Sequence, residues 1–148
     1  MFGFTQGNKL VRHSNAVAAG ATAITPSAGI DTKGFEACTF IAAIGAIVSG
    51  AATSIEVHAS SDDGVGDAYG ALEGSKVTIA DDGDNKLYYV EVVRPVKRYL
   101  KLVVNRATQN ATLDGIVAVL SGARALPVTH DTTVGGGELH VTPAEGTA

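Results

Sequence analysis

The side chains that could carry out acid–base, nucleophilic or metal chemistry are four histidines, one cysteine and two groups of aspartates. The histidines, His13, His58, His130 and His140, do not stand at metal-ligand spacing from one another or from Cys38. A Cys–His pair could activate a thiolate nucleophile, but the sequence around Cys38 offers neither an electropositive setting nor an oxyanion hole. We therefore predict four surface histidines and a buried, unreactive Cys38.

Two acidic loops contain the oxygen ligands that calcium prefers. Their carboxylates belong to Asp62, Asp63 and Asp67 in the first loop, and to Asp81, Asp82 and Asp84 in the second. Neither loop matches the EF-hand pattern, because the glycine and the distant glutamate are misplaced. Turn formation accounts for both groups without a metal, since Asp and Ser side chains hydrogen-bond the local backbone. We predict no metal site, with calcium in these loops as the alternative.

Motifs of nucleophilic, phosphate-binding and glycosidic chemistry are missing. The nucleophile-elbow context is lacking around Ser27, Ser49, Ser61 and Ser121. The three glycines at 135–137 follow no expected strand and open no expected helix, so they do not form a phosphate loop. Carboxylate pairs that cleave sugars usually stand beside stacking aromatics, and the chain has no Trp. The sequence predicts a non-enzymatic protein with no catalytic residue and no cofactor.

Charge is segregated along the middle of the chain. Eight acidic residues and one basic residue lie between Glu56 and Asp84, whereas six basic residues and one acidic residue lie between Lys86 and Arg106. One interpretation is a solvated edge strand protected by Lys and Arg. The other is that the acidic loops of one copy face the basic segment of the next. The overall net charge of −4 argues against a general nucleic-acid binder.

The composition favours strands joined by tight turns. Of the 148 residues 45% are hydrophobic, with abundant Ala, Val and Ile, and 18 are Gly. We expect short strands at 9–13, 16–24 (two around Gly20), 35–44, 53–60, 68–72, 76–79, 86–93, 98–104 and 113–120. In 53–60, Ile55, Val57 and Ala59 alternate with Glu56 and His58, as in a half-buried strand. A helix is the competing interpretation of 35–44, where the β-branched residues and nearby Gly45 and Gly50 favour a strand.

These segments predict an all-β fold, a β-sandwich or jelly-roll-like single domain over residues 9–125. The strongest hairpin signal joins 86–93 to 98–104 through the Pro-containing turn at 94–97. Residues 1–8 have no hydrophobic period, and residues 126–148 are rich in Gly, Thr and Pro. We interpret these two ends as an N-terminal arm and an extended C-terminal arm that becomes ordered on a partner.

The sequence also bears on the compartment. No signal-peptide pattern opens the chain, and the longest apolar run, at 40–48, is too short to span a bilayer. A single cysteine excludes an internal disulfide. We expect a protein made in a reducing cytoplasm, with no membrane and no nucleic acid among its partners.

Several segments together resemble small structural proteins of tailed bacteriophage virions. The segments are 55–64 (IEVHASSDDG), 68–74 (AYGALEG), 88–93 (YYVEVV), 98–104 (RYLKLVV), 127–131 (PVTHD) and 143–146 (PAEG). The pattern is a strand, an acidic Gly turn, a short strand and then a strand pair with an Arg-Tyr-hydrophobic segment. The resemblance covers roughly residues 35–148, and it is most marked to capsid decoration (cement) proteins.

This resemblance implies a protein made in the bacterial host cytoplasm that sits on the outer capsid surface and bridges neighbouring major capsid proteins. It further implies no cofactor, no active site, and self-association as a dimer or trimer. Other virion positions remain open: a tail-tube, connector or fibre protein. A carbohydrate-binding module is the alternative from another class, with Tyr69, Tyr88, Tyr89 and Tyr99 as its candidate stacking residues.

Overall fold

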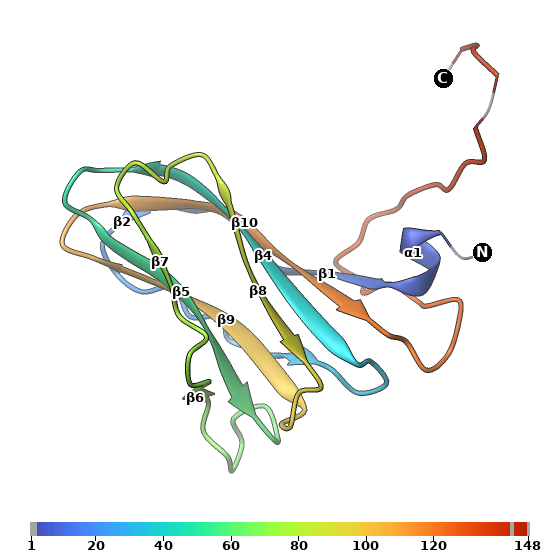
Figure 1. Cartoon of the computed structure of the whole chain (residues 1–148), viewed down its shortest axis with the longest axis horizontal. Coiled ribbons are helices and arrows are strands. Elements are labelled where there is room, and N and C mark those ends of the chain that lie inside the picture. Colours follow the sequence, from blue (N-terminus) through green and yellow to red (C-terminus); the bar gives the residue numbers. More distant parts are fainter. Residues whose placement is uncertain (1–2, 143, 148) are drawn as a thin grey trace.

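Ten strands pair into two antiparallel sheets that pack face to face around the hydrophobic core (Figure 1). This is seen in a computed structural model that describes residues 3–142 and 144–147, so that residues 1–2, 143 and 148 of the predicted arms lie outside the described residues. The all-β prediction is confirmed. The elements are α1 (Phe4–Gly7), β1 (Lys9–Ser14), β2 (Val17–Gly20), β3 (Ile30–Asp31), β4 (Ala37–Ile47), β5 (Ala52–Ser60), β6 (Gly70–Ala71), β7 (Val77–Ile79), β8 (Leu87–Val93), β9 (Tyr99–Ala107) and β10 (Ala111–Ser121).

The strands pair in a nested order. The first sheet runs β1-β10-β4-β8, with β2 also on β10; the second runs β3-β9-β5-β6, with β7 also on β5. The first strand therefore pairs with the last, β3 with β9, and β4 with β8. Consecutive long strands fall in different sheets, so the chain crosses the sandwich repeatedly. Only β6 follows its pairing partner β5 directly.

The hairpin predicted between 86–93 and 98–104 is wrong. Both strands exist, but β8 pairs with β4 in one sheet and β9 pairs with β5 in the other. Residues 94–97 form a corner between the sheets, where Arg94 has a φ of 53° and its N–H donates to the Glu36 carbonyl at 2.7 Å. Burial explains the difference: β8 has one exposed row, whereas β9 is buried on both faces. A turn signal does not specify which sheet receives the next strand.

The strand patterns at the centre of the chain are confirmed. Residues 37–47 form a strand rather than a helix, with Cys38 and Phe40 fully buried. Ile55, Val57 and Ala59 line the core, as their alternation predicts. The outward row of β4 is only half-buried, however, so this strand is not covered on both faces as its apolar sequence suggests.

His13 lies between the two sheets, not on the surface as predicted. Its Nε2 accepts the N–H of Leu102 at 3.1 Å, and its ring packs at 5.1 Å from the Phe40 ring. Burial, and secondarily the positive charge of Lys101, lowers the pKa of His13 to about 4. The side chain faces inward because alternation along β1 places His13 on the same side as buried Val11, while Arg12 between them is exposed.

Arg106 is buried without an acidic partner. Its Nε donates to the Thr22 carbonyl, and its Nη1 donates to the carbonyls of Ala18 and Ala111, each at 2.8 Å. Gly20 makes room for the guanidinium, since a Cβ there would lie 3.1 Å from Nη2. Three carbonyl partners satisfy donors that would otherwise be costly to bury. Arg106 thus joins β9 to the start of β10 and to the segment around β2.

We expect stability to fall as the pH drops from 6.5 to 4. In the unfolded chain the histidine has its ordinary pKa of 6.5, so between pH 6.5 and 4 it takes up a proton while folded His13 remains neutral, and protonation therefore favours the unfolded chain. Urea unfolding should show a loss on the order of 2 kcal/mol from this group. In His13→Gln, whose amide oxygen can still accept the Leu102 N–H, that part of the pH dependence should disappear. His58→Gln is the control, and an equal effect in both variants would contradict the assignment.

Removing the buried guanidinium should destabilise the fold far more than removing an exposed one. Arg106→Leu leaves three carbonyls without their donor, and we expect it to lower the free energy of unfolding by about 3 kcal/mol. Arg98→Leu is the matched control, because Arg98 pairs with Asp31 at the surface, and it should cost less than about 1 kcal/mol. Similar losses in denaturant unfolding at pH 7 would be inconsistent with this view of Arg106.

Candidate functional site: the sheet edges and the C-terminal arm

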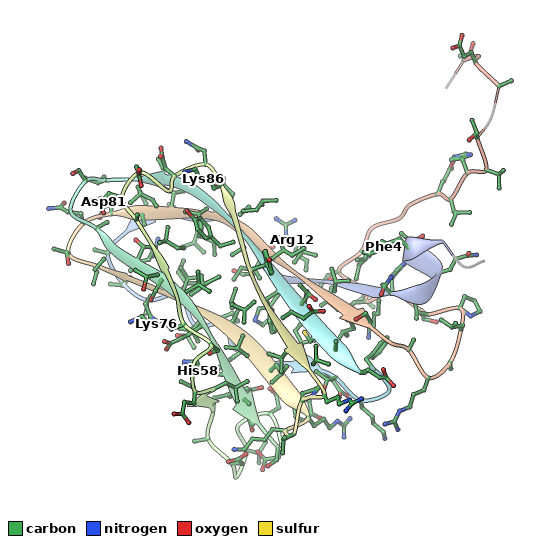
Figure 2. All side chains as sticks on the ribbon, in the orientation of Figure 1. Phe4, Arg12, His58, Lys76, Asp81 and Lys86 are labelled. Carbon is green, nitrogen blue, oxygen red and sulfur yellow. The ribbon has the colours of Figure 1, made fainter. Side chains whose placement is uncertain are left out.

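The predicted chemistry-bearing residues are dispersed over the fold. His58 contacts Glu56 on the outer face of β5, whereas Asp81 and Lys86 lie at the other end of the sandwich (Figure 2). His140 contacts Glu138 in the C-terminal arm. Burial raises the pKa of the Cys38 thiol to about 12. Among the described residues, no group of three His, Cys, Asp or Glu side chains is placed to hold a metal ion.

The first acidic loop uses its carboxylates to order its own backbone. Asp62 accepts the N–H groups of Val65, Gly66 and Asp67, and these bonds lower its pKa. Lys97 lies 2.7 Å from Asp67 and, together with the Ser61 N–H and hydroxyl, lowers the pKa of that carboxyl to about 2. In the second loop, Asp81 accepts the Gly50 N–H at 2.6 Å. Turn chemistry of the predicted kind thus orders the first loop, whereas the bond from Gly50 to Asp81 joins two segments that are distant in the sequence.

Much of the basic segment is engaged within the same chain. Lys97 meets Asp67, Arg98 pairs with Asp31 at 2.6 Å, and Lys101 lies 3.8 Å from the centre of the Tyr69 ring. Arg106 is inside the fold. Four of the six basic side chains are thus engaged within the same chain, and one of them, Lys97, pairs with the acidic segment through Asp67.

The C-terminal arm begins by covering one edge of the first sheet. The Val128 N–H donates to the Gln6 carbonyl at 2.9 Å, and the Asp131 N–H donates to the Leu10 carbonyl at 3.3 Å. On the same strand, the Leu10 N–H donates to His130 Nδ1 at 3.1 Å and the Arg12 N–H donates to Thr133 Oγ1 at 2.9 Å. Residues 128–133 therefore satisfy the outer edge of β1 without an outside partner.

Beyond Thr133 the arm leaves the sandwich. Figure 1 shows it running past α1 and away from both sheets. Val141 is 91% exposed, whereas Leu139 is 50% exposed and its side chain lies against Gly3 of the N-terminal arm. The N-terminal arm, predicted without regular structure, forms the single helical turn α1, capped by a hydrogen bond from the Gly3 N–H to Gln6 Oε1 at 3.0 Å.

The opposite edge of the first sheet is open. β8 ends the strand order, and within the described residues no strand pairs with its outer side. Leu87 and Tyr89 on this strand are both 68% exposed, and Val93 is 63% exposed. The edges of the second sheet are short by comparison, since β3, β6 and β7 have two or three residues each. β8 is the longest open edge in the described part of the chain.

Comparisons with known proteins give little guidance. No protein-family model and no curated protein matches the sequence. The structure is similar to a chain from work titled "Bacillus endospore appendages form a novel family of disulfide-linked pili", with 11% sequence identity and a TM-score of 0.41. The alignment covers 79% of this chain and 91% of that one. A likeness this distant assigns no activity and no partner.

One further finding concerns membranes. Over residues 3–142 and 144–147, no helix has the length and apolar character needed to cross a bilayer.

We expect the two side chains that fasten the arm to β1 to control its attachment. His130→Ala combined with Thr133→Val removes the acceptors of the Leu10 and Arg12 N–H groups, so both amides should exchange with solvent at least about tenfold faster. Hydrogen exchange followed by NMR measures this directly. His58→Ala is the control, because His58 lies on the other sheet. Unchanged exchange in the double variant would mean that the arm does not shield this edge.

Proposed function

We propose that this chain is a non-enzymatic structural protein of a tailed-bacteriophage virion, which decorates the outer capsid surface and bridges neighbouring major capsid proteins. The observation that carries the proposal is the C-terminal arm. Its first part is fastened to β1 through His130 and Thr133, and its second part carries exposed Leu139 and Val141 away from the sandwich. An anchored arm with apolar side chains in solvent suits attachment to a neighbouring protein.

The strand order supports the same proposal. Nested pairing across two sheets is the connectivity expected of a jelly roll, an arrangement found in viral capsid domains and also in lectins and cupins. Because one fold serves several functions, the strand order supports the class of protein, a virion structural protein, and does not indicate its position in the particle. The sequence resemblance over residues 35–148 favours the outer shell.

Repetition on a shell explains how modest contacts could suffice. A short arm that orders on binding gains little affinity for each contact, because ordering its backbone costs conformational entropy. A particle presents many equivalent sites, and a protein that touches two neighbours at once binds with the gain of multivalency. Bridging therefore raises both the occupancy of the protein and the resistance of the shell to disruption.

The alternative functions have less support from the side chains. A carbohydrate-binding module needs exposed aromatic rings, yet Tyr88 donates its hydroxyl to the Gly83 carbonyl and Tyr69 packs under Lys101. Tyr89 is the exposed exception. A tail-tube, connector or fibre protein would share the sandwich and arm, so the copy number in the particle separates it from a decoration protein.

The proposal is tested by adding the purified full chain to shells that lack it. We expect saturable binding at many copies per particle and a rise of several degrees in the temperature at which the shell is disrupted. A chain shortened after Val134 should keep the circular dichroism of the sandwich, because it retains β1–β10 and the fastened part of the arm. It should nevertheless fail to stay on the shell during gradient sedimentation.

Val65→Asp is the matched control for this experiment, because Val65 is 90% exposed and lies in the 61–67 loop, away from the arm. It should bind as the natural chain does. Absence of binding by the full chain would refute the decoration role, and one small ring of copies per particle would indicate a connector instead.

A further inference from the structure

The two edges of the first sheet are treated differently by this chain. The outer edge of β1 is covered by residues 128–133 of the same molecule, whereas β8 has no covering segment among the described residues. A long exposed edge presents backbone groups that another strand can bind. The structure therefore holds an open acceptor edge and, in the distal C-terminal arm, a segment without a partner strand.

The hydrogen-bonding direction of β8 follows from its register with β4. The Ile44 N–H donates to the Lys86 carbonyl at 3.0 Å, and the Arg94 N–H donates to the Glu36 carbonyl at 2.7 Å. The register between these two bonds has no shift. Since bonding alternates along an antiparallel strand, the even-numbered residues of β8 face β4. The backbone groups of Leu87, Tyr89, Glu91 and Val93 consequently point to the open side.

Both side-chain rows of β8 can also accept an apolar neighbour. The outward row contains exposed Leu87, Tyr89 and Val93, with Glu91 as its one charged member. The inward row consists of Tyr88, Val90 and Val92, which pack against the edge of the core and are only half-buried. An added strand would cover apolar surface on either face.

The distal arm has the sequence of such a strand. Residues 138–142 read Glu-Leu-His-Val-Thr, so that Leu139 and Val141 alternate with polar side chains. This period of two places both apolar side chains on one face of an extended segment. In either orientation on β8, that face would meet an apolar row.

The arm cannot reach the β8 edge of its own molecule. Thr133 is fastened one strand position outside β1, and a strand added to β8 would lie five strand spacings away, about 24 Å. The five residues from Thr133 to Glu138 span about 17 Å when fully extended. Figure 1 also shows the arm directed away from the sheets. Pairing between these two elements therefore requires a second copy.

We propose that residues 138–142 of one copy add as a strand to the open edge of β8 in another copy of this chain. Main-chain hydrogen bonds to residues 87–93 supply the binding, and Leu139 and Val141 supply the apolar contact. Because the arm and the edge are different surfaces, the contact is head-to-tail, and repetition closes a ring or extends a chain of copies. This self-association does not depend on the capsid role.

Complementation between two variants tests the proposal. Val141→Asp damages the arm and leaves the β8 edge intact, whereas Tyr89→Asp damages the edge and leaves the arm intact. Sedimentation velocity of each full-length variant alone should show a dissociation constant raised at least about tenfold over the natural chain. An equimolar mixture of the two should form dimers, because one intact arm still meets one intact edge. Val65→Asp, at an exposed site distant from both elements, should associate as the natural chain does.

Three results would overturn the proposal. The natural chain could remain monomeric at high concentration, or the single variants could associate as strongly as the natural chain. The third result is a mixture that stays monomeric while each variant is weakened, because an intact arm would then fail to bind an intact edge. Circular dichroism of each variant confirms that the sandwich is intact, which is expected because Val141 and Tyr89 are both exposed.

Discussion

Satisfying the backbone at the edges of two sheets is the constraint on which the rest of this structure depends. Nested pairing places β10, β4, β9 and β5 in the interior of the sheets, where neighbours on both sides take up their N–H and C=O groups. The outer strands need other partners, and so does the part of β9 that the two-residue strand β3 does not reach. Side chains supply several of them: His130 and Thr133 accept from β1, and His13 accepts from the part of β9 that lies past the two-residue strand β3.

The same polar side chains join parts of the fold that lie far apart in the sequence. His13 connects β1 in one sheet to Leu102 in the other, and Arg106 connects β9 to β10 and to the segment around β2. The core is built mainly from Ala, Val, Ile and Leu, and among the residues that the structure describes Phe40 is the one phenylalanine that is fully buried. Small apolar side chains allow close packing but little directional preference. Buried hydrogen bonds of known geometry then help to specify one register.

Local patterns predicted the strands well and their partners poorly. The alternation at Ile55, Val57 and Ala59 reports which face of one strand is buried, and this needs no knowledge of its neighbours. Which strand β8 pairs with, and which strand β9 pairs with, depends on the whole nested topology. The turn signal at 94–97 therefore indicated a hairpin that does not form. His13 escaped prediction because a histidine was assigned to the surface, although it lies two residues after buried Val11 and therefore on the same face of β1. The attachment of residues 128–133 to β1 was not predicted either. Two of its four hydrogen bonds use the side chains of His130 and Thr133, which look like ordinary surface residues in the sequence.

The candidate site, formed by the β8 edge and the C-terminal arm, is harder to predict from sequence than a catalytic site. Catalytic chemistry needs particular residue types close together, and the dispersed histidines and turn-forming aspartates did not suggest such a group. A strand edge, in contrast, offers backbone atoms that every sequence possesses, and only the strand order identifies which edge is left open. The alternation of Leu139 and Val141 becomes informative once β8 is known to end its sheet. Both β8 and the distal arm expose apolar side chains, so each can bury the apolar surface of the other when they pair.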